Sequence, residues 1–100
     1  MIENTNEKKD ENIVFIGEKP FMNYVRAVEV QFGNEENDEV IIKARGKFIS
    51  RAVDVEQVIK NGPLGKKVST KSMKTESEEF TNKEGRKVKV STIEITLKKK

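Results

Sequence analysis

The spacing of apolar residues changes once along this chain, at Asn61-Gly62-Pro63. Before this point, short apolar runs at 13–16 and 40–42 each precede a segment whose apolar residues recur every three or four positions. After it, the pattern has a period of two. Short continuous runs indicate buried strands, steps of three and four indicate amphipathic helices, and alternation indicates exposed strands. The sequence therefore predicts both helices before Pro63 and a hairpin after it.

The first strand and helix have clear boundaries. The strand runs from Asn12 to Ile16 and is closed by Gly17, while Pro20 suits the first turn of a helix, where its missing N–H costs nothing. This helix is expected to end near Gly33. Its predicted apolar face consists of Phe21, Tyr24, Val25, Val28 and Phe32.

An acidic loop at 34–38 leads to the second strand, Glu39 to Ala44. Its continuous apolar run is typical of a strand that is covered on both faces. The helix that follows is expected to stop at Gly62-Pro63. Its predicted apolar face consists of Phe48, Ile49, Ala52, Val53, Val55, Val58 and Ile59.

The last third of the chain predicts two strands, 68–79 and 86–97, around a turn at 83–85. Ten residues of strand span roughly 30 Å, so the hairpin is expected to project from the body as an arm. Apolar positions in its second strand are even at Val88 and Val90 but odd from Ile93 onward. Because a slip of one residue exchanges the faces of a strand, we expect a bulge or a sharp twist near Ser91-Thr92.

The expected order of elements is β-α-β-α-β-β. It predicts an α/β two-layer sandwich with a four-stranded mixed sheet, both helices on one face and an extended C-terminal β-hairpin. Residues 1–12 are polar and lack periodicity, so we interpret them as a disordered tail. Residues 13–100 are then a single domain, small enough that a second subunit would help to complete its core.

Composition excludes several classes of function. The chain has no cysteine and no histidine, so it lacks a disulfide framework, a Cys/His zinc site and a histidine general base. An enzyme would have to rely on Ser50, Ser69 or a carboxylate pair, and no motif supports that. No apolar run approaches the length of a transmembrane helix, and the N-terminus lacks a secretory signal. We expect an intracellular, soluble, non-catalytic protein without cofactor, metal, small-molecule substrate or membrane partner.

Positive charge is concentrated in the predicted domain. The net charge of the whole chain is +3, residues 1–12 contribute −2, and the remainder is therefore +5. Lys43, Arg45 and Lys47 alternate around a glycine where strand becomes helix, with Arg51 one helical turn further on. No acidic residue lies between Glu39 and Asp54. This pattern favours a surface that binds phosphates over a merely solvated strand end.

Several segments carry a pattern that can be compared with known families. They are Ile16–Val25 at the entry to the first helix, Val40–Lys47 and Ile49–Asp54 around the basic junction, and Val90–Ile95 in the last strand. Together these segments resemble the Alba family of small archaeal chromatin proteins. The resemblance covers roughly residues 12 to 98 and keeps the order of the motifs.

The resemblance implies a homodimer that binds double-stranded DNA and RNA, largely independently of sequence, as an architectural protein of the chromosome in the cytoplasm. The second helices of two subunits would lie side by side, and each hairpin would reach into a minor groove. The residues that it assigns to nucleic-acid binding are Lys19, Asn23, Lys43, Arg45, Lys47, Arg51, Arg86 and Lys87. An alternative within the same family is an RNA-binding or scaffold subunit that acts in RNA processing.

The chain departs from the family pattern in two places. Glu18 stands where the family has the first of two lysines, so this position repels phosphate and offers no site for acetylation. Gly62-Pro63 stands near the end of the second helix, where the family often has an aromatic residue that helps dimers to associate along DNA. The arm also carries several glutamates that are able to pair with Arg86 and Lys87, and its Phe80 is either a turn anchor or an apolar wedge. We interpret Tyr24 as a core residue.

Overall fold

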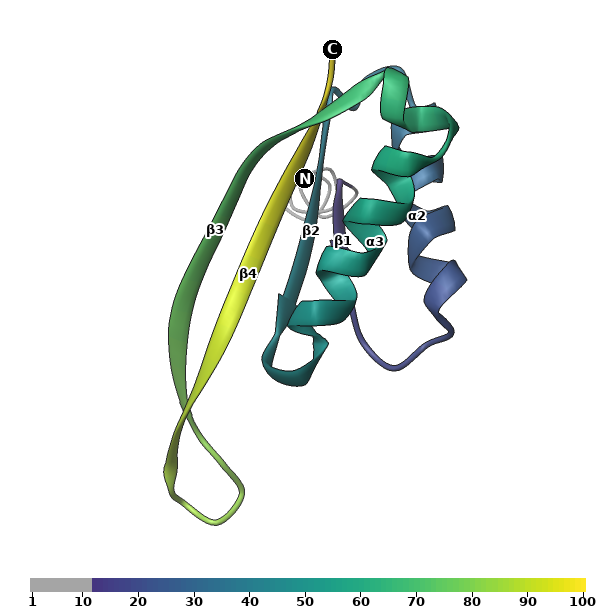
Figure 1. Ribbon diagram of the computed structural model, residues 1–100. Coiled ribbons are helices and arrows are strands. Elements are labelled where there is room, and N and C mark those ends of the chain that lie inside the picture. The colour runs from purple at the N-terminus through teal and green to yellow at the C-terminus, as the bar shows by residue number, and fades with distance from the viewer. Residues whose placement is uncertain (1–11) are drawn as a thin grey trace, which may run out of the picture.

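The computed structural model describes residues 12–100, and it confirms the expected order of elements (Figure 1). The tail predicted over residues 1–12 lies outside the described residues, apart from Asn12. The elements are β1 (Ile13–Phe15), α2 (Phe21–Gly33), β2 (Glu39–Arg45), the 3-10 turn η1 (Gly46–Phe48), α3 (Ile49–Asn61), the 3-10 turn η2 (Pro63–Lys66), β3 (Val68–Thr81) and β4 (Lys87–Lys99).

The four strands form one mixed sheet in the order β1-β2-β4-β3. β1 and β2 are parallel, and the other two pairs are antiparallel. Both helices lie on the same face of this sheet (Figure 1). The face that they do not cover, carrying Phe15, Lys43 and Glu94, is called the open face below. The predicted two-layer α/β sandwich is confirmed.

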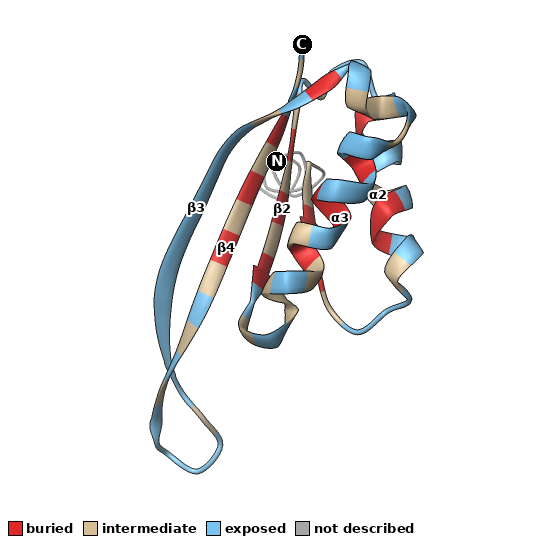
Figure 2. Cartoon of the chain, viewed as in Figure 1, coloured by how far each residue is buried: buried red, intermediate tan, exposed pale blue. Residues whose placement is uncertain are grey.

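The core lies between the helices and the sheet face beneath them (Figure 2). Val14, Ile42 and Ile95 are neighbours across β1, β2 and β4, and all three are buried. β2 was expected to be covered on both faces, and this is wrong for the single chain. Val40 and Ile42 are fully buried, but the intervening Ile41 is only half-buried because it lies on the open face.

β3 and β4 extend well beyond the helices as the predicted arm, whose exposed residues stand out in Figure 2. A bulge or a sharp twist was expected near Ser91-Thr92. The bulge is absent, because pairing continues without a shift from Thr81 opposite Lys87 to Ser72 opposite Thr96. The register shift falls instead on β3, between Thr70 and Ser72.

The change of parity in β4 has a different cause. Where the strand underlies the helices, Ile93 and Ile95 face the core. Further along, the arm has passed the helices, and the apolar side chains lie on the open face instead. Val88 pairs there with Phe80, and the methyl group of Val90 approaches the Gly46 turn. The apolar positions change parity because the apolar side chains of β4 pack against the core in one part of the strand and on the open face in the other. The register of the backbone pairing does not slip there.

The residue displaced by the register shift, Lys71, ties the base of the arm to the body. Its Nζ donates to Oε2 of Glu39, at the start of β2, at 2.7 Å. This hydrogen bond lowers the pKa of Glu39 below its ordinary value, and the charges of Lys71 and Lys98 act in the same direction. A depressed carboxyl pKa means that the stabilisation from this hydrogen bond is present above the unfolded-state pKa and disappears as the pH falls through the folded-state pKa.

Glu56 makes a second connection between the arm and the body. It is fully buried on the inner face of α3, although the predicted apolar face did not include it. Val58, which that predicted face did include, is 39% exposed. The hydroxyl of Thr70 in β3 donates to Glu56 Oε2 at 2.6 Å, and Gln57 Nε2 donates to Oε1 at 3.3 Å. A buried carboxylate is tolerated when its oxygens are hydrogen-bonded in this way.

We predict that Thr70→Val lowers the free energy of unfolding by about 1–3 kcal/mol, because the buried Glu56 carboxylate loses its hydroxyl donor. Urea denaturation at a fixed protein concentration measures the change. Thr75→Val, at an exposed position of the same strand, is the matched control.

The double variant Glu56→Leu with Thr70→Val should recover most of the lost stability, since both polar partners are then replaced by apolar groups. Equal stability of the wild type and the Thr70→Val variant would contradict the role given to this hydrogen bond.

Candidate nucleic-acid interface

A glycine turn builds the basic junction at the end of β2. Gly46 has φ = 59°, in the left-handed region that side chains rarely adopt. A Cβ at this position would also approach a methyl group of Val90 to 3.2 Å. The turn reverses the chain directly into η1 and α3, so that Arg45 and Lys47 flank the point of reversal.

The three predicted cations of this junction all form ion pairs. Lys43 Nζ lies 3.3 Å from Oε2 of Glu94 in β4, and Arg45 Nη1 lies 3.3 Å from Oε1 of Glu78 in β3. Lys47 Nζ lies 3.8 Å from Oε2 of Glu18, in the loop before α2. The carboxylates come from segments far away in the sequence. The absence of acidic residues between Glu39 and Asp54 therefore does not leave the junction unpaired.

These ion pairs are weak enough to exchange. The side chains of Arg45 and Glu78 are 65% and 57% exposed, and those of Lys47 and Glu18 are 77% and 81% exposed. Exposed pairs contribute about 0–1 kcal/mol, because water and salt screen them. A phosphate group can therefore replace a carboxylate beside each cation at small cost, although it must compete with that carboxylate.

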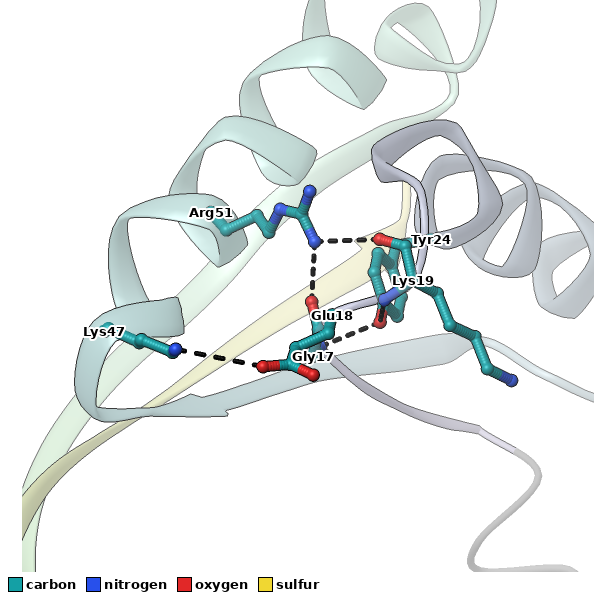
Figure 3. A network of polar contacts seen from close by, with 6 residues as sticks. All are labelled: Gly17, Glu18, Lys19, Tyr24, Lys47 and Arg51. Carbon is teal, nitrogen blue, oxygen red and sulfur yellow. Dashed lines mark hydrogen bonds and ion pairs between the residues drawn. The ribbon is translucent and has the colours of Figure 1, made fainter.

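Tyr24 and Arg51 fix the loop that precedes α2 (Figure 3). The buried Tyr24 hydroxyl accepts hydrogen bonds from the backbone N–H groups of Gly17 and Lys19, each at 2.9 Å. Arg51 Nη1 donates to the carbonyl oxygens of the same two residues, at 2.6 and 2.8 Å. We call this arrangement the Tyr24–Arg51 clamp. It confirms the interpretation of Tyr24 as a core residue.

The clamp holds Lys19 by its backbone and leaves its side chain exposed. In Figure 3 this side chain extends away from Arg51 and Tyr24. Asn23 is exposed in the first turn of α2. Arg51, predicted as a phosphate contact, uses Nη1 to position the loop, which sequence reasoning missed. The sequence signal for this positioning role was the presence of Tyr24 and Arg51 on two neighbouring helices.

Arg86 and Lys87 lie at the far end of the arm. Arg86 belongs to the turn rather than to the strand, and Lys87 is the first residue of β4. Asn82 shapes this turn, because its Oδ1 accepts hydrogen bonds from the backbone N–H groups of Glu84 and Arg86. Both cations are exposed, and neither takes part in the ion pairs found among residues 12–100.

The predicted binding residues thus converge on one end of the molecule. The loop carrying Lys19 and the Gly46 turn lie at the lower end in Figure 1, and the arm projects beyond that same end. Within the described part of the chain, no group of three or more acidic side chains is arranged to hold a metal ion. Neither α2 nor α3 has the length and apolar character to cross a membrane.

Comparisons with known proteins point to one family. The model of the Alba family matches residues 12–77. A DNA/RNA-binding protein Alba from Methanococcus maripaludis is 46% identical over 87 residues, which cover 87% of this chain and 97% of the relative.

Solved structures agree. Alba from Thermoplasma volcanium superimposes with a TM-score of 0.78 at 42% identity, covering 87% of this chain and 99% of that one. ALBA1 from Trypanosoma brucei has a TM-score of 0.71 at 23% identity, covering 89% of this chain and 69% of that one, and shows the same fold.

We predict that Tyr24→Phe accelerates hydrogen exchange at the Gly17 and Lys19 amides and lowers the free energy of unfolding by about 1–2 kcal/mol. The reason is that both amides lose their acceptor. Exchange followed by NMR measures the local effect. The Asn37 amide, bonded to the Asn34 carbonyl in a distant loop, is the internal control. Unchanged protection of both clamp amides would contradict the clamp.

Proposed function

This chain belongs to the Alba family, and on that premise we propose that it is a non-catalytic, dimeric architectural protein that binds double-stranded DNA and RNA. We further propose that binding is largely independent of sequence and that the protein acts on the chromosome. The name of the relative from Methanococcus maripaludis, a DNA/RNA-binding protein, supports the nucleic-acid binding in this proposal.

The observation that carries the proposal is the convergence of exposed cations from three segments on the end from which the arm projects. Thr92 of β4 lies opposite Arg45, and Lys87 is five residues further along the same strand. At about 3.3 Å per residue, Lys87 therefore lies about 17 Å beyond the junction, which is about half of the roughly 34 Å that one turn of B-DNA advances. A body that contacts one stretch of phosphates can thus place Arg86 and Lys87 of the same subunit about half a helical turn away. In this arrangement the cations around the Gly46 turn bind the first stretch of phosphates, and the arm carries the distant contacts.

Sequence independence follows from the chemistry of these groups. Lysine and arginine side chains on exposed loops and strand ends bind phosphate oxygens, which carry no sequence information. Such contacts release counterions and make affinity depend steeply on salt. Because the cations of the junction already have carboxylate partners, binding exchanges Glu78, Glu94 and Glu18 for phosphates, and affinity should remain moderate.

A dimer is supported by the outer surface of α3. A shallow hollow there is lined by Phe21, Asp54, Gln57, Val58, Asn61 and Gly62. The second helices of two subunits can pack across this hollow and cover Val58, which is 39% exposed in the single chain. Pairing would bring two basic ends and two arms to one duplex, and so multiply the number of phosphates bound.

We predict that Arg45→Ala and Lys47→Ala each weaken binding to duplex DNA and reduce the slope of log affinity against log salt by about 0.9 for each phosphate that the variant no longer binds. Fluorescence anisotropy over a range of salt concentrations measures both quantities. Lys66→Ala, in η2 at the opposite end, is the matched control.

The variant Glu78→Gln should act in the opposite direction and raise duplex affinity about two- to fivefold, because Arg45 loses its competing carboxylate. Glu35→Gln, in the acidic loop, controls for net charge. If folded Arg45→Ala and Lys47→Ala variants keep the affinity and slope of the wild type, this surface does not bind DNA. Parallel titrations with duplex RNA of the same length show whether RNA uses the same residues.

We predict that Val58→Glu shifts the protein toward monomer in sedimentation velocity, since a charge would be buried against the partner helix. Ser50→Glu, exposed in the first turn of α3 and outside the hollow, is the control. A Val58→Glu variant that sediments as the wild type does would place any dimer contact elsewhere.

A further inference from the structure

We propose that a cleft on the open face of the sheet binds an unpaired nucleobase of a single-stranded nucleic acid. The cleft, called the Phe15 cleft below, is lined chiefly by Phe15, Lys43, Arg45, Phe48, Thr92 and Glu94. Its volume is about 510 Å³, within the range of about 300–1,000 Å³ that is usual for small-ligand sites. The cleft adjoins the phosphate-binding end proposed above and shares Lys43 and Arg45 with it, but it would hold a base rather than a phosphate, so the inference goes beyond that function.

Phe15 is the reason for considering a base. Its neighbours along the chain, Val14 and Ile16, are buried under the helices, so the alternation of the strand turns Phe15 to the other side. There its side chain is 64% exposed, although it sits in a regular strand rather than in a loop. An exposed aromatic ring on a rigid sheet face is the platform on which single-stranded nucleic acids stack their bases.

The groups beside the ring suit the edge of a base. Phe15, Lys43 and Glu94 are direct neighbours across β1, β2 and β4, so ring, donor and acceptor lie in one row. Lys43 Nζ lies 5.9 Å from the centre of the Phe15 ring and 3.3 Å from Glu94 Oε2. The ammonium group donates to base carbonyl oxygens and ring nitrogens, and the carboxylate accepts from exocyclic amino groups.

The next row adds groups for the sugar and phosphate. Arg45 pairs with Thr92 across β2 and β4, and both line the cleft. Arg45 is 65% exposed in its side chain and lies at the rim, where a flanking phosphate of the bound strand would pass. The Thr92 hydroxyl donates to the Glu76 carbonyl oxygen at the long distance of 3.3 Å.

The charges of the cleft favour a neutral base over a free anion. Glu76, Glu78 and Glu94 line it together with the cations, so an isolated phosphate would meet carboxylates on several sides. A base carries no charge, and its phosphates remain at the rim near Arg45 and Lys47. In a duplex the faces of the bases are stacked and inaccessible, so the Phe15 cleft selects single strands and loops.

The experiment compares single-stranded and duplex DNA of the same length, with 2-aminopurine as one base of the single strand. Stacking on Phe15 should quench the 2-aminopurine fluorescence when the wild-type protein binds. Phe15→Leu should weaken single-strand binding about tenfold and reduce the quenching, while duplex affinity changes less than about twofold. Phe15→Tyr, which keeps the ring, should retain both properties.

Phe80→Leu is the matched control, because it removes an exposed ring of the same kind from the arm, outside the cleft. Circular dichroism checks that all variants fold. Because Phe15 is exposed and lies outside the core, its replacement should leave the fold intact. Equal losses for single strands and duplex in Phe15→Leu, equal single-strand losses in Phe15→Leu and Phe80→Leu, or unchanged quenching in Phe15→Leu would each overturn the proposal. A shift of Phe15→Leu from dimer to monomer would also overturn it, by making a second copy of the chain the occupant of this face.

The result is separable from that of the proposed function. If duplex DNA does not bind at all but single strands bind and depend on Phe15, the Phe15 cleft stands and the duplex surface fails. If duplex DNA binds through Arg45 and Lys47 but single strands do not depend on Phe15, the reverse holds.

Discussion

Burial of one face of a four-stranded sheet under two helices organises the rest of this molecule. It places the apolar side chains of β2 and β4 in the core and leaves the opposite face free for charged and aromatic groups. The helices are shorter than β3 and β4, so the hairpin extends beyond the helices that cover the sheet and forms an arm. A chain with few apolar residues can build only a small core, and the length of its two helices sets where that core ends.

Much of this architecture could be predicted from the sequence, because periodicity reports burial directly. The spacing of Phe21 to Phe32 specified a helix, and the alternation after Pro63 specified the arm. The prediction of a bulge at Ser91-Thr92 was wrong, because it took the change in apolar parity as a slip in pairing. A change in apolar parity shows only that the buried face changes, and here Val90 meets the Gly46 turn of another element without any break in pairing.

The candidate site was less accessible to sequence reasoning, because its electrostatics depend on contacts between distant segments. The basic residues were visible as a cluster, but Glu78 and Glu94, which pair with Arg45 and Lys43, lie more than thirty residues further along the chain. Likewise, Glu56 reads as a charge that interrupts an apolar face, and only the hydroxyl of Thr70 explains its burial. Where a polar group finds its partner is a property of the fold.

Lys43 and Arg45 belong both to the basic end and to the Phe15 cleft, and this sharing has a thermodynamic consequence. A cation that contacts a duplex phosphate cannot at the same time line a cleft that holds a base and its backbone. If both proposals hold, duplex and single strand therefore compete for part of one surface, and each weakens binding of the other by the same factor. Glu78 and Glu94 take part in the same competition, since they hold these cations when neither ligand is bound. The cations of the open face then have three alternative partners, which are a duplex, a single strand and the carboxylates of Glu78 and Glu94. The population of each state depends on the relative affinities of these partners and on salt.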